Sequence, residues 1–234
     1  MAEPALRVLR TGGLWFDGVS GYVQAPHFYY NGHFTVSVWF KFNYQETPTY
    51  RAHTLVDNGF GVYTDWSFTI DRHAALYPDK ALIGFVTRGG GSIVNYSYWL
   101  YAETWYHAAV VTNDGIYVNG VKIASGSINI DNITKGSHPL RIARSTYTVP
   151  SYYFYFPGII NKVCIYNRSL SIDEIKAIYE RDELIKDGLV LCLDFTEGEG
   201  NIAYDKSGMG NHATIYGGAR WVIKKALRVL PKAR

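Results

Sequence analysis

The sequence predicts an all-β fold, a sandwich of two antiparallel sheets with one short helix near residues 171–182. Three observations favour this fold class. Runs of alternating apolar and polar residues recur along the chain, as in strands that bury one face. Gly, Asn and Asp residues separate these runs at the spacing of a sandwich. The composition includes 20 tyrosines and 23 glycines among 234 residues, which suits strands and turns better than helices.

The strands follow one another in a regular order. FTVSVWFKFN, residues 34–43, places Phe and Val on one face and polar residues on the other, with Trp39 interrupting the polar face. The run 116–125 is a hairpin, because Asn119 and Gly120 at its centre tolerate positive φ. Together with the other β-rich runs there are at least nine strand candidates. Those other runs span 66–71, 81–87, 92–101, 105–112, 140–144, 158–167 and 189–195.

One segment reads as a helix. In LSIDEIKAIYERDEL, Ser171 is the expected N-cap, and Glu174 three residues later completes a capping box. The apolar residues behind this cap recur at helical spacing and supply a buried face. They are Ile172, Ile175, Ala177, Ile178 and Tyr179.

The length indicates one domain, residues 1–234. The distribution of charge indicates a basic tail at 223–234. The net charge of +3 is too small to indicate nucleic-acid binding. No run of about 18 apolar residues exists, so no membrane span is expected. Subtracting six cations of the last fifteen residues from +3 leaves the rest of the chain at −3. Those cations are Arg220, Lys224, Lys225, Arg228, Lys232 and Arg234.

Motifs of known catalysis do not occur. The chain has no G-x-S-x-G, no H-E-x-x-H and no paired C-x-x-C. His107, inside a predicted strand, is expected to be a buried core or interface residue rather than a metal ligand. Glycoside hydrolysis needs two carboxylates aimed across a cleft, and no predicted strand carries closely spaced acids. We therefore expect no enzymatic activity, no cofactor and no metal.

Several stretches together resemble the laminin-G-like modules of the concanavalin A-like lectin/glucanase superfamily. The resemblance covers most of the chain and implies a jelly-roll sandwich. The stretches that carry it are LWFDGVSGYVQAP (14–26), FTVSVWFKF (34–42), TWYHAAVV (104–111), IYVNGVKIASG (116–126), PLRIAR (139–144) and GIINKVCIYNRSLSIDEIKAIY (158–179).

The order of one segment departs from the family. Residues 188–222 resemble the strand and loop that usually open such a module, yet here they follow the helix that usually closes it. The pentapeptide ALRVL occurs at 5–9 and again at 226–230, as if both ends represented one junction. The sequence therefore predicts a circularly permuted module, or one cut from an array in mid-module.

This displacement suggests a function in assembly. The apolar strand at 189–195 is needed by the sandwich, and it can return to its own chain or enter a neighbouring subunit by strand donation. Head-to-tail donation would give a filament. We therefore predict a non-catalytic structural module of an extracellular filament or virion surface, whose partners are its own copies or other surface proteins. The expected subunit contacts are Leu189, Leu191, Leu193, Phe195, Trp221, Leu227, Val229 and Leu230.

The alternative is a lectin-like adhesion module that binds glycans, and a glucanase-like hydrolase ranks third. Glycan binding needs exposed rings beside polar groups. The candidate rings are Tyr63, Trp66, Tyr96 and Trp99. Many members of the family carry calcium, and Asp17 and Asp205 match residues common there. Asn161 stands where the family usually has Asp, and no complete oxygen cage is visible, so no calcium is predicted.

The compartment is expected to be extracellular or the virion surface. Three N-glycosylation sequons, at Asn95, Asn132 and Asn167, hint at an extracellular location, and a start at Met1 without an apolar signal segment fits a viral structural protein. Buried free thiols are the default expectation for Cys164 and Cys192, with a disulfide as the alternative.

Overall fold

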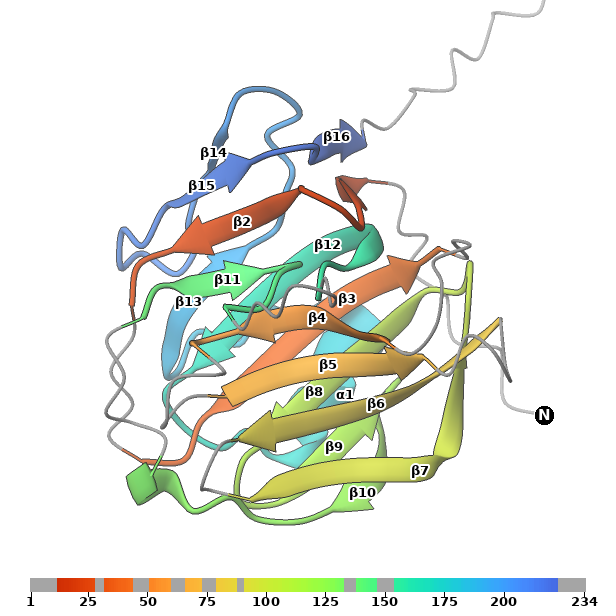
Figure 1. Ribbon diagram of the computed structural model, residues 1–234. Helices are drawn as coiled ribbons and strands as arrows, with labels where there is room; N and C mark the ends of the chain where they lie inside the picture. The colour runs from red at the N-terminus through yellow and green to blue at the C-terminus, as the bar shows by residue number, and fades with distance from the viewer. Residues whose placement is uncertain are drawn as a thin grey trace, which may run out of the picture.

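A computed structural model describes residues 12–27, 32–43, 51–59, 66–72, 79–87, 91–132, 138–146 and 154–222. It is a sandwich of two antiparallel sheets with one helix, as predicted (Figure 1). We call the sheet at the back of Figure 1 sheet A and the sheet at the front sheet B.

Sheet A is built around β12 (Pro157–Tyr166). Its long edge pairs with β3 (Thr35–Phe42), while the opposite edge pairs with β1 (Gly13–Asp17) and β13 (Leu189–Leu193). The remaining strands extend the sheet on both sides. They are β8 (Tyr106–Val111), β9 (Gly115–Val118) and β10 (Val121–Ser125) beyond β3, and β16 (Arg220–Val222) beside β1.

Sheet B has the order β14-β15-β2-β11-β4-β5-β6-β7. Strands from both ends of the described chain meet in it, because β15 pairs with β2. Its strands are β14 (Ile202–Ala203), β15 (Ala213–Tyr216), β2 (Tyr22–Ala25), β11 (Leu140–Ile142), β4 (Arg51–Asp57), β5 (Trp66–Arg72), β6 (Lys80–Thr87) and β7 (Ser92–Tyr101). A 3₁₀ turn, η1 (Ile130–Asn132), precedes β11.

The main core lies between the sheets. It is filled by the apolar residues that alternate along the strands, such as Val36, Val38 and Phe40 of β3. The strands predicted by alternation are all present, and the hairpin forms at Asn119 and Gly120, both with positive φ. β4 was not predicted, because His53, Thr54 and Asp57 interrupt its apolar pattern even though all three are buried.

Helix α1 (Ile172–Arg181) covers the outer face of sheet A. Ser171 caps it, and the predicted capping box with Glu174 is present. Ile175 and Ile178 pack on sheet A in a second apolar cluster, while Ile172 is exposed. The helix also explains Trp39, whose ring lies 5.8 Å from that of Tyr179 and so is buried on the face that looked polar in sequence. The described part of the chain contains no helix long and apolar enough to cross a membrane.

Candidate functional site

The rings nominated from the sequence do not gather at one place. Trp66 is 0% exposed and packs against Phe34 and Phe85 in the core, so this prediction is wrong: its ring cannot reach a sugar. Trp99 is half-buried on β7, with the Lys80 ammonium 5.9 Å from its ring centroid. Tyr96 lies on β7, but its side chain is outside the described set, as is the whole of Tyr63.

The nominated subunit contacts lie inside their own chain wherever they are described. Leu191, Leu193 and Phe195 belong to the core between the sheets, and Leu189 packs beneath α1. Trp221 pairs with Leu14 across β16 and β1, and its indole Nε1 donates to the carbonyl of Gly200 at 2.9 Å. Leu227, Val229 and Leu230 lie outside the described residues.

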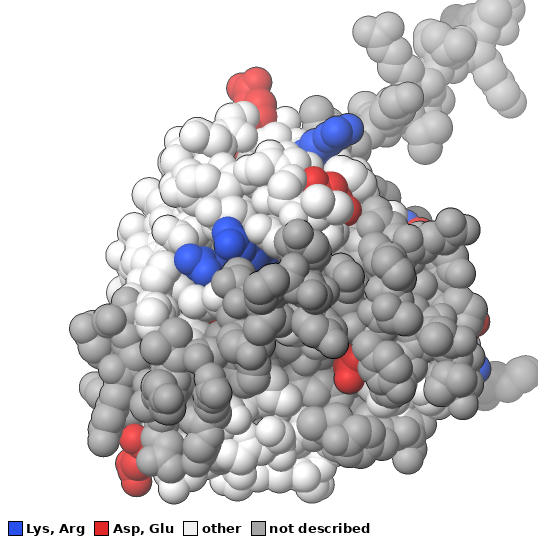
Figure 2. Space-filling view, in the orientation of Figure 1, with Lys and Arg blue, Asp and Glu red and all other residues white. Residues whose placement is uncertain are grey.

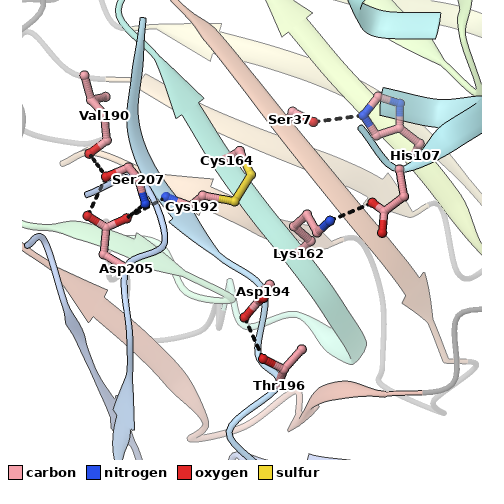
Figure 3. The surroundings of a disulfide bond; sticks show 11 residues. Ser37, His107, Lys162, Cys164, Val190, Cys192, Asp194, Thr196, Asp205 and Ser207 are labelled. Atoms are coloured by element: carbon pink, nitrogen blue, oxygen red, sulfur yellow. Dashed lines mark hydrogen bonds and ion pairs between the residues drawn. A yellow bond between two sulfur atoms is a disulfide. The ribbon is translucent and has the colours of Figure 1, made fainter. Parts of the chain in front are cut away.

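The two cysteines form a disulfide, so the expectation of free thiols is wrong. Cys164 on β12 and Cys192 on β13 face each other in register, with their Cα atoms 4.2 Å apart (Figure 3). Both are buried beneath α1. No local pattern predicts this pairing, because the residues are 28 positions apart and only the strand register aligns them.

The two aspartates that match the family's calcium residues organise turns. Asp17 accepts hydrogen bonds from the backbone N–H groups of residues 19, 20 and 21 and from the Ser20 hydroxyl. Burial raises the pKa of Asp17, but these hydrogen bonds outweigh it and hold the pKa well below its ordinary value. Asp205 is held in the same way by Ser207, Asn211 and the N–H of Cys192 (Figure 3). Since hydrogen-bond donors surround both carboxylates, neither fits the oxygen cage that Ca²⁺ requires.

Within the described residues no helix covers the outer face of sheet B (Figure 1). Five residues on five adjacent strands form what we call the polar row. Because they alternate with core residues such as Val23 and Ile142, their side chains point away from the core. At the usual strand spacing the row is about 19 Å long. Its members are Thr214, Gln24, Arg141, Asp57 and Ser67, each opposite the next in register.

A second row, the ring row, runs beside the first. Tyr216 and Tyr22 lie opposite each other and stack, with centroids 4.9 Å apart and planes 14° apart. The Arg144 guanidinium is 4.8 Å from the Tyr22 centroid and 5.3 Å from that of Tyr155. Tyr216 and Tyr22 are each two residues along their strands from Thr214 and Gln24, so the rows are about 7 Å apart.

Arg144 reaches this face because the backbone breaks its alternation. Ala143 has φ +66°, so Ile142 and Ala143 both face the core and the next side chain emerges outward. The conformation is held on both sides: Ala143 N–H donates to the Leu55 carbonyl at 3.0 Å, and its carbonyl accepts from Phe156 at 2.9 Å. Positive φ in a residue other than glycine costs energy, so the surrounding strands hold this geometry.

Solvent exposure decreases along the polar row. Thr214, Gln24 and Arg141 are half-buried, whereas Asp57 and Ser67 are buried. Burial raises the pKa of Asp57, opposed by hydrogen bonds from Thr146, Gly59 and Ser145. Figure 2, drawn from this side, shows Lys and Arg atoms on the surface over β11. The accessible half of the site is therefore cationic and the far half is closed.

Together the two rows place rings on one side of this face and hydrogen-bonding groups on the other. Tyr216, at the outer end of the ring row, is 39% exposed, since β14 pairs with β15 only at Thr214 and Ala213. Amphipathic rings beside fixed polar groups suit a ligand with both C–H and hydroxyl surfaces. Sequence reasoning missed this site because Tyr22, Arg144, Tyr155 and Tyr216 come from four distant segments without a motif.

A family match and several solved structures relate the chain to known proteins. Residues 17–176 match a family described as the concanavalin A-like lectin/glucanases superfamily, in its laminin G group. No curated protein sequence matches the chain.

Solved structures share the fold. A candidate carbohydrate-binding protein from Bacteroides ovatus superposes with a TM-score of 0.67 at 19% identity, over 92% of this chain and 60% of that one. This chain thus spans 60% of the length of that relative. A heptameric pentraxin from Limulus polyphemus gives 0.57 at 13% identity, over 92% and 95% of the two chains.

Domain 4 of the extracellular arabinanase AbnA from Geobacillus stearothermophilus, solved with arabinotriose, gives 0.52 at 20% identity, over 70% of this chain and 75% of that one. Identities this low show a common fold and nothing finer. The family match covers more than half of the chain and agrees with the two-sheet sandwich. The chain belongs to the concanavalin A-like lectin/glucanase superfamily.

Proposed function

We propose that this protein is a non-catalytic carbohydrate-binding module that holds a glycan on the outer face of sheet B. The observation that carries the proposal is the pairing of the ring row with the polar row. A sugar ring placed on this face can lie against Tyr216 and Tyr22 while its hydroxyl groups meet Gln24 and Thr214.

Two of the structural neighbours support the carbohydrate part of the proposal. The Bacteroides protein is described as a candidate carbohydrate-binding protein, and the arabinanase domain was solved with an arabinose oligosaccharide. These properties belong to those proteins. They make the glycan-binding hypothesis stronger than the assembly hypothesis for a chain with the same fold.

The spacing of the acids supports binding without hydrolysis. Asp57 lies opposite Ser67 on β5, and Asp71 is four residues further along that strand, on the same face. Four residues of strand separate them by about 14 Å, beyond the roughly 5–9.5 Å between the two carboxyl groups of glycosidases. Asp57 is also committed to Ser145 and Thr146.

The assembly hypothesis has less support. β13, the strand that would be donated, pairs with β12 of its own chain from Val163 to Tyr166, and its leucines are buried there. A strand that fills its own sheet leaves no open groove for a neighbour's strand. We therefore propose a self-contained module rather than a filament subunit.

We also propose that the module is circularly permuted. β16 pairs with β1 antiparallel, with Val222 opposite Gly13, which is how the two arms of a hairpin pair when the turn between them has been opened. The repeats of ALRVL lie just outside these strands, beyond the described residues. The family match ends at residue 176, before β13, β15 and β16.

The disulfide bears on the compartment. Disulfides form and persist in oxidising surroundings and are rare in the cytosol. With Cys164 and Cys192 bonded, and an extracellular enzyme domain among the neighbours, we propose that the protein is secreted.

A glycan microarray probed with the full chain tests the proposal. We expect binding to at least one glycan class, lost on Tyr216→Ala or Tyr22→Ala. Tyr204→Ala, a change of another exposed tyrosine at 50% exposure, is the matched control and should bind normally. Thermal melts must show all variants folded. A folded wild-type chain that binds no glycan at high valency would overturn the proposal, as would loss of binding on Trp99→Ala with Tyr216→Ala unaffected.

A further inference from the structure

Two guanidinium groups on the outer face of sheet B have no acidic partner among the described residues. The side chains of Arg141 and Arg144 make no ion pair or hydrogen bond within this part of the chain, and the Nε atom of each is buried. The guanidinium group of Arg144 lies over the rings of Tyr22 and Tyr155. A half-buried cation without a counter-ion favours an anion more strongly than an exposed one does, because the local dielectric is lower.

Two other arginines have acidic partners. Arg168 makes two hydrogen bonds to the Glu174 carboxylate, at 2.6 and 3.0 Å, and Arg181 pairs with Glu183 at 2.9 Å. The contrast places the unpaired charge on the candidate binding face. Arg220 also lacks a carboxylate among the described residues, but it is exposed on sheet A over the ring of Trp15 at 5.4 Å.

The nearest acid in register does not neutralise this charge. Asp57 lies opposite Arg141, but its carboxylate oxygens accept hydrogen bonds from Ser145, Thr146 and Gly59 and make no ion pair within the described residues. Within the described residues, the Arg141 guanidinium therefore has no carboxylate partner.

We infer that the site recognises an anionic saccharide, whose carboxylate or sulfate group binds the guanidinium groups of Arg141 and Arg144. This inference rests on the proposed carbohydrate-binding function and names the class of sugar. The planar guanidinium matches the paired oxygens of either anion and forms charge-assisted hydrogen bonds with them. The neighbouring rings and the amide of Gln24 would hold the rest of the sugar, which an inorganic anion lacks.

The test compares charged and neutral forms of the same sugars. Oligogalacturonate is paired with its carboxyl-reduced product, and a heparin oligosaccharide with its desulfated product, in calorimetry with the full-length chain. We expect the charged member of at least one pair to bind roughly tenfold to a hundredfold more tightly than its neutral form, and less tightly as salt is raised. The pair that shows the preference identifies carboxylate or sulfate as the recognised group.

Substitutions test which residues cause the preference for the charged saccharide. Arg141→Gln and Arg144→Gln should each remove it, and Arg144→Lys should restore part of it because charge remains while the fork geometry is lost. Arg220→Gln, which removes the same charge on the other sheet, should leave it intact. Circular dichroism melts check that each variant is folded.

Equal binding of charged and neutral forms would overturn the inference while the carbohydrate-binding proposal stands. A preference that survives in both glutamine variants but falls in Arg220→Gln would also overturn it. Binding of no sugar by the folded chain would remove both proposals.

Discussion

The two outer faces of the sandwich differ in whether the helix covers them. On sheet A the outer face carries Trp39, Tyr166 and the disulfide, and α1 lies across it, so its side chains form a second apolar cluster. On sheet B the outer face carries tyrosines, arginines and amides, and within the described residues no helix crosses it (Figure 1). Both faces carry rings, but α1 buries those beneath it on sheet A, whereas the rings and arginines of the two rows on sheet B are half-buried or exposed.

This difference suggests that the outer face of sheet A contributes mainly to stability, and that of sheet B mainly to the proposed ligand binding. Apolar side chains beneath α1 gain free energy by leaving water, so their removal should weaken the fold. The half-buried polar side chains of sheet B, such as Gln24, Arg141 and Thr214, gain little by folding because they remain in contact with solvent. Their arrangement is better explained by a ligand than by stability.

The largest loss of stability is expected from placing a charge in the apolar cluster between α1 and sheet A. Ile175→Asp puts a carboxylate into the fully buried cluster under α1, where it has no partner, and should cost about 4 kcal/mol or more in the free energy of unfolding. Urea denaturation measures it. Lys176→Asp, the next residue and exposed on the same helix, is the control and should change little. Equal effects at both positions would mean that α1 does not pack as described.

The disulfide is the next largest contribution on the covered face. Replacing Cys164 and Cys192 together by Ala opens a loop of 28 residues and should cost about 3–4 kcal/mol. A reducing agent should lower the melting temperature of the native chain toward that of the variant. Glycan binding below the melting transition should be unchanged, since the bond lies under α1. A melting temperature insensitive to both treatments would show that the thiols are not bonded.

A smaller effect depends on pH. Two hydrogen bonds from Arg168, with the Ser171 N–H, lower the pKa of Glu174 from 4.5 to about 2 in the folded chain. A carboxyl with a depressed folded pKa stabilises the fold above its unfolded pKa. That stability is lost as pH falls from about 4.5 toward about 2.

Glu174→Gln should therefore flatten the dependence of stability on pH in this window, whereas Glu180→Gln, a change of an exposed helix residue, should leave it unchanged. Denaturant midpoints measured between these pH values provide the comparison. Identical curves for the wild type and Glu174→Gln would contradict the role of this pair.

The smallest effect is expected from relinking the chain. Joining Val222 to Gly13 through a short turn, and opening the chain between Asp187 and Gly188, should give a folded protein whose stability changes by about 1 kcal/mol or less, because the joined residues already face each other. Circular dichroism and denaturation check it. A relinked chain that aggregates would speak against the permuted order.

Most of the fold could be predicted from the sequence, because alternation in segments such as 34–43 and the capping box of Ser171 and Glu174 are local signals. β4 was not predicted, because its polar residues are buried by contacts that no local pattern reveals. His53, for example, hydrogen-bonds through Nδ1 to the carbonyl of Tyr155, 102 positions away. Trp66 was nominated for binding because a ring in sequence does not show which face of its strand is buried.

The candidate site was hidden for a different reason. Tyr22 and Tyr216 are 194 positions apart and become neighbours only through the pairing of β2 with β15. Arg144 faces outward only because Ala143 adopts positive φ, a conformation that nothing in LRIAR signals. Recognition surfaces of this kind depend on strand register, which local sequence does not specify.

The most direct test of the account is to map where a sugar touches the protein. Amide NMR spectra of the full chain, titrated with the saccharide that binds best in the calorimetry above, should show the largest shifts along the two rows, at Tyr22, Gln24, Arg141, Thr214 and Tyr216. Amides of α1 and β13 beneath it should hardly move. Shifts concentrated on the sheet A side, or confined to the surroundings of Trp99 and Tyr101, would contradict the claim that the outer face of sheet B is the binding surface.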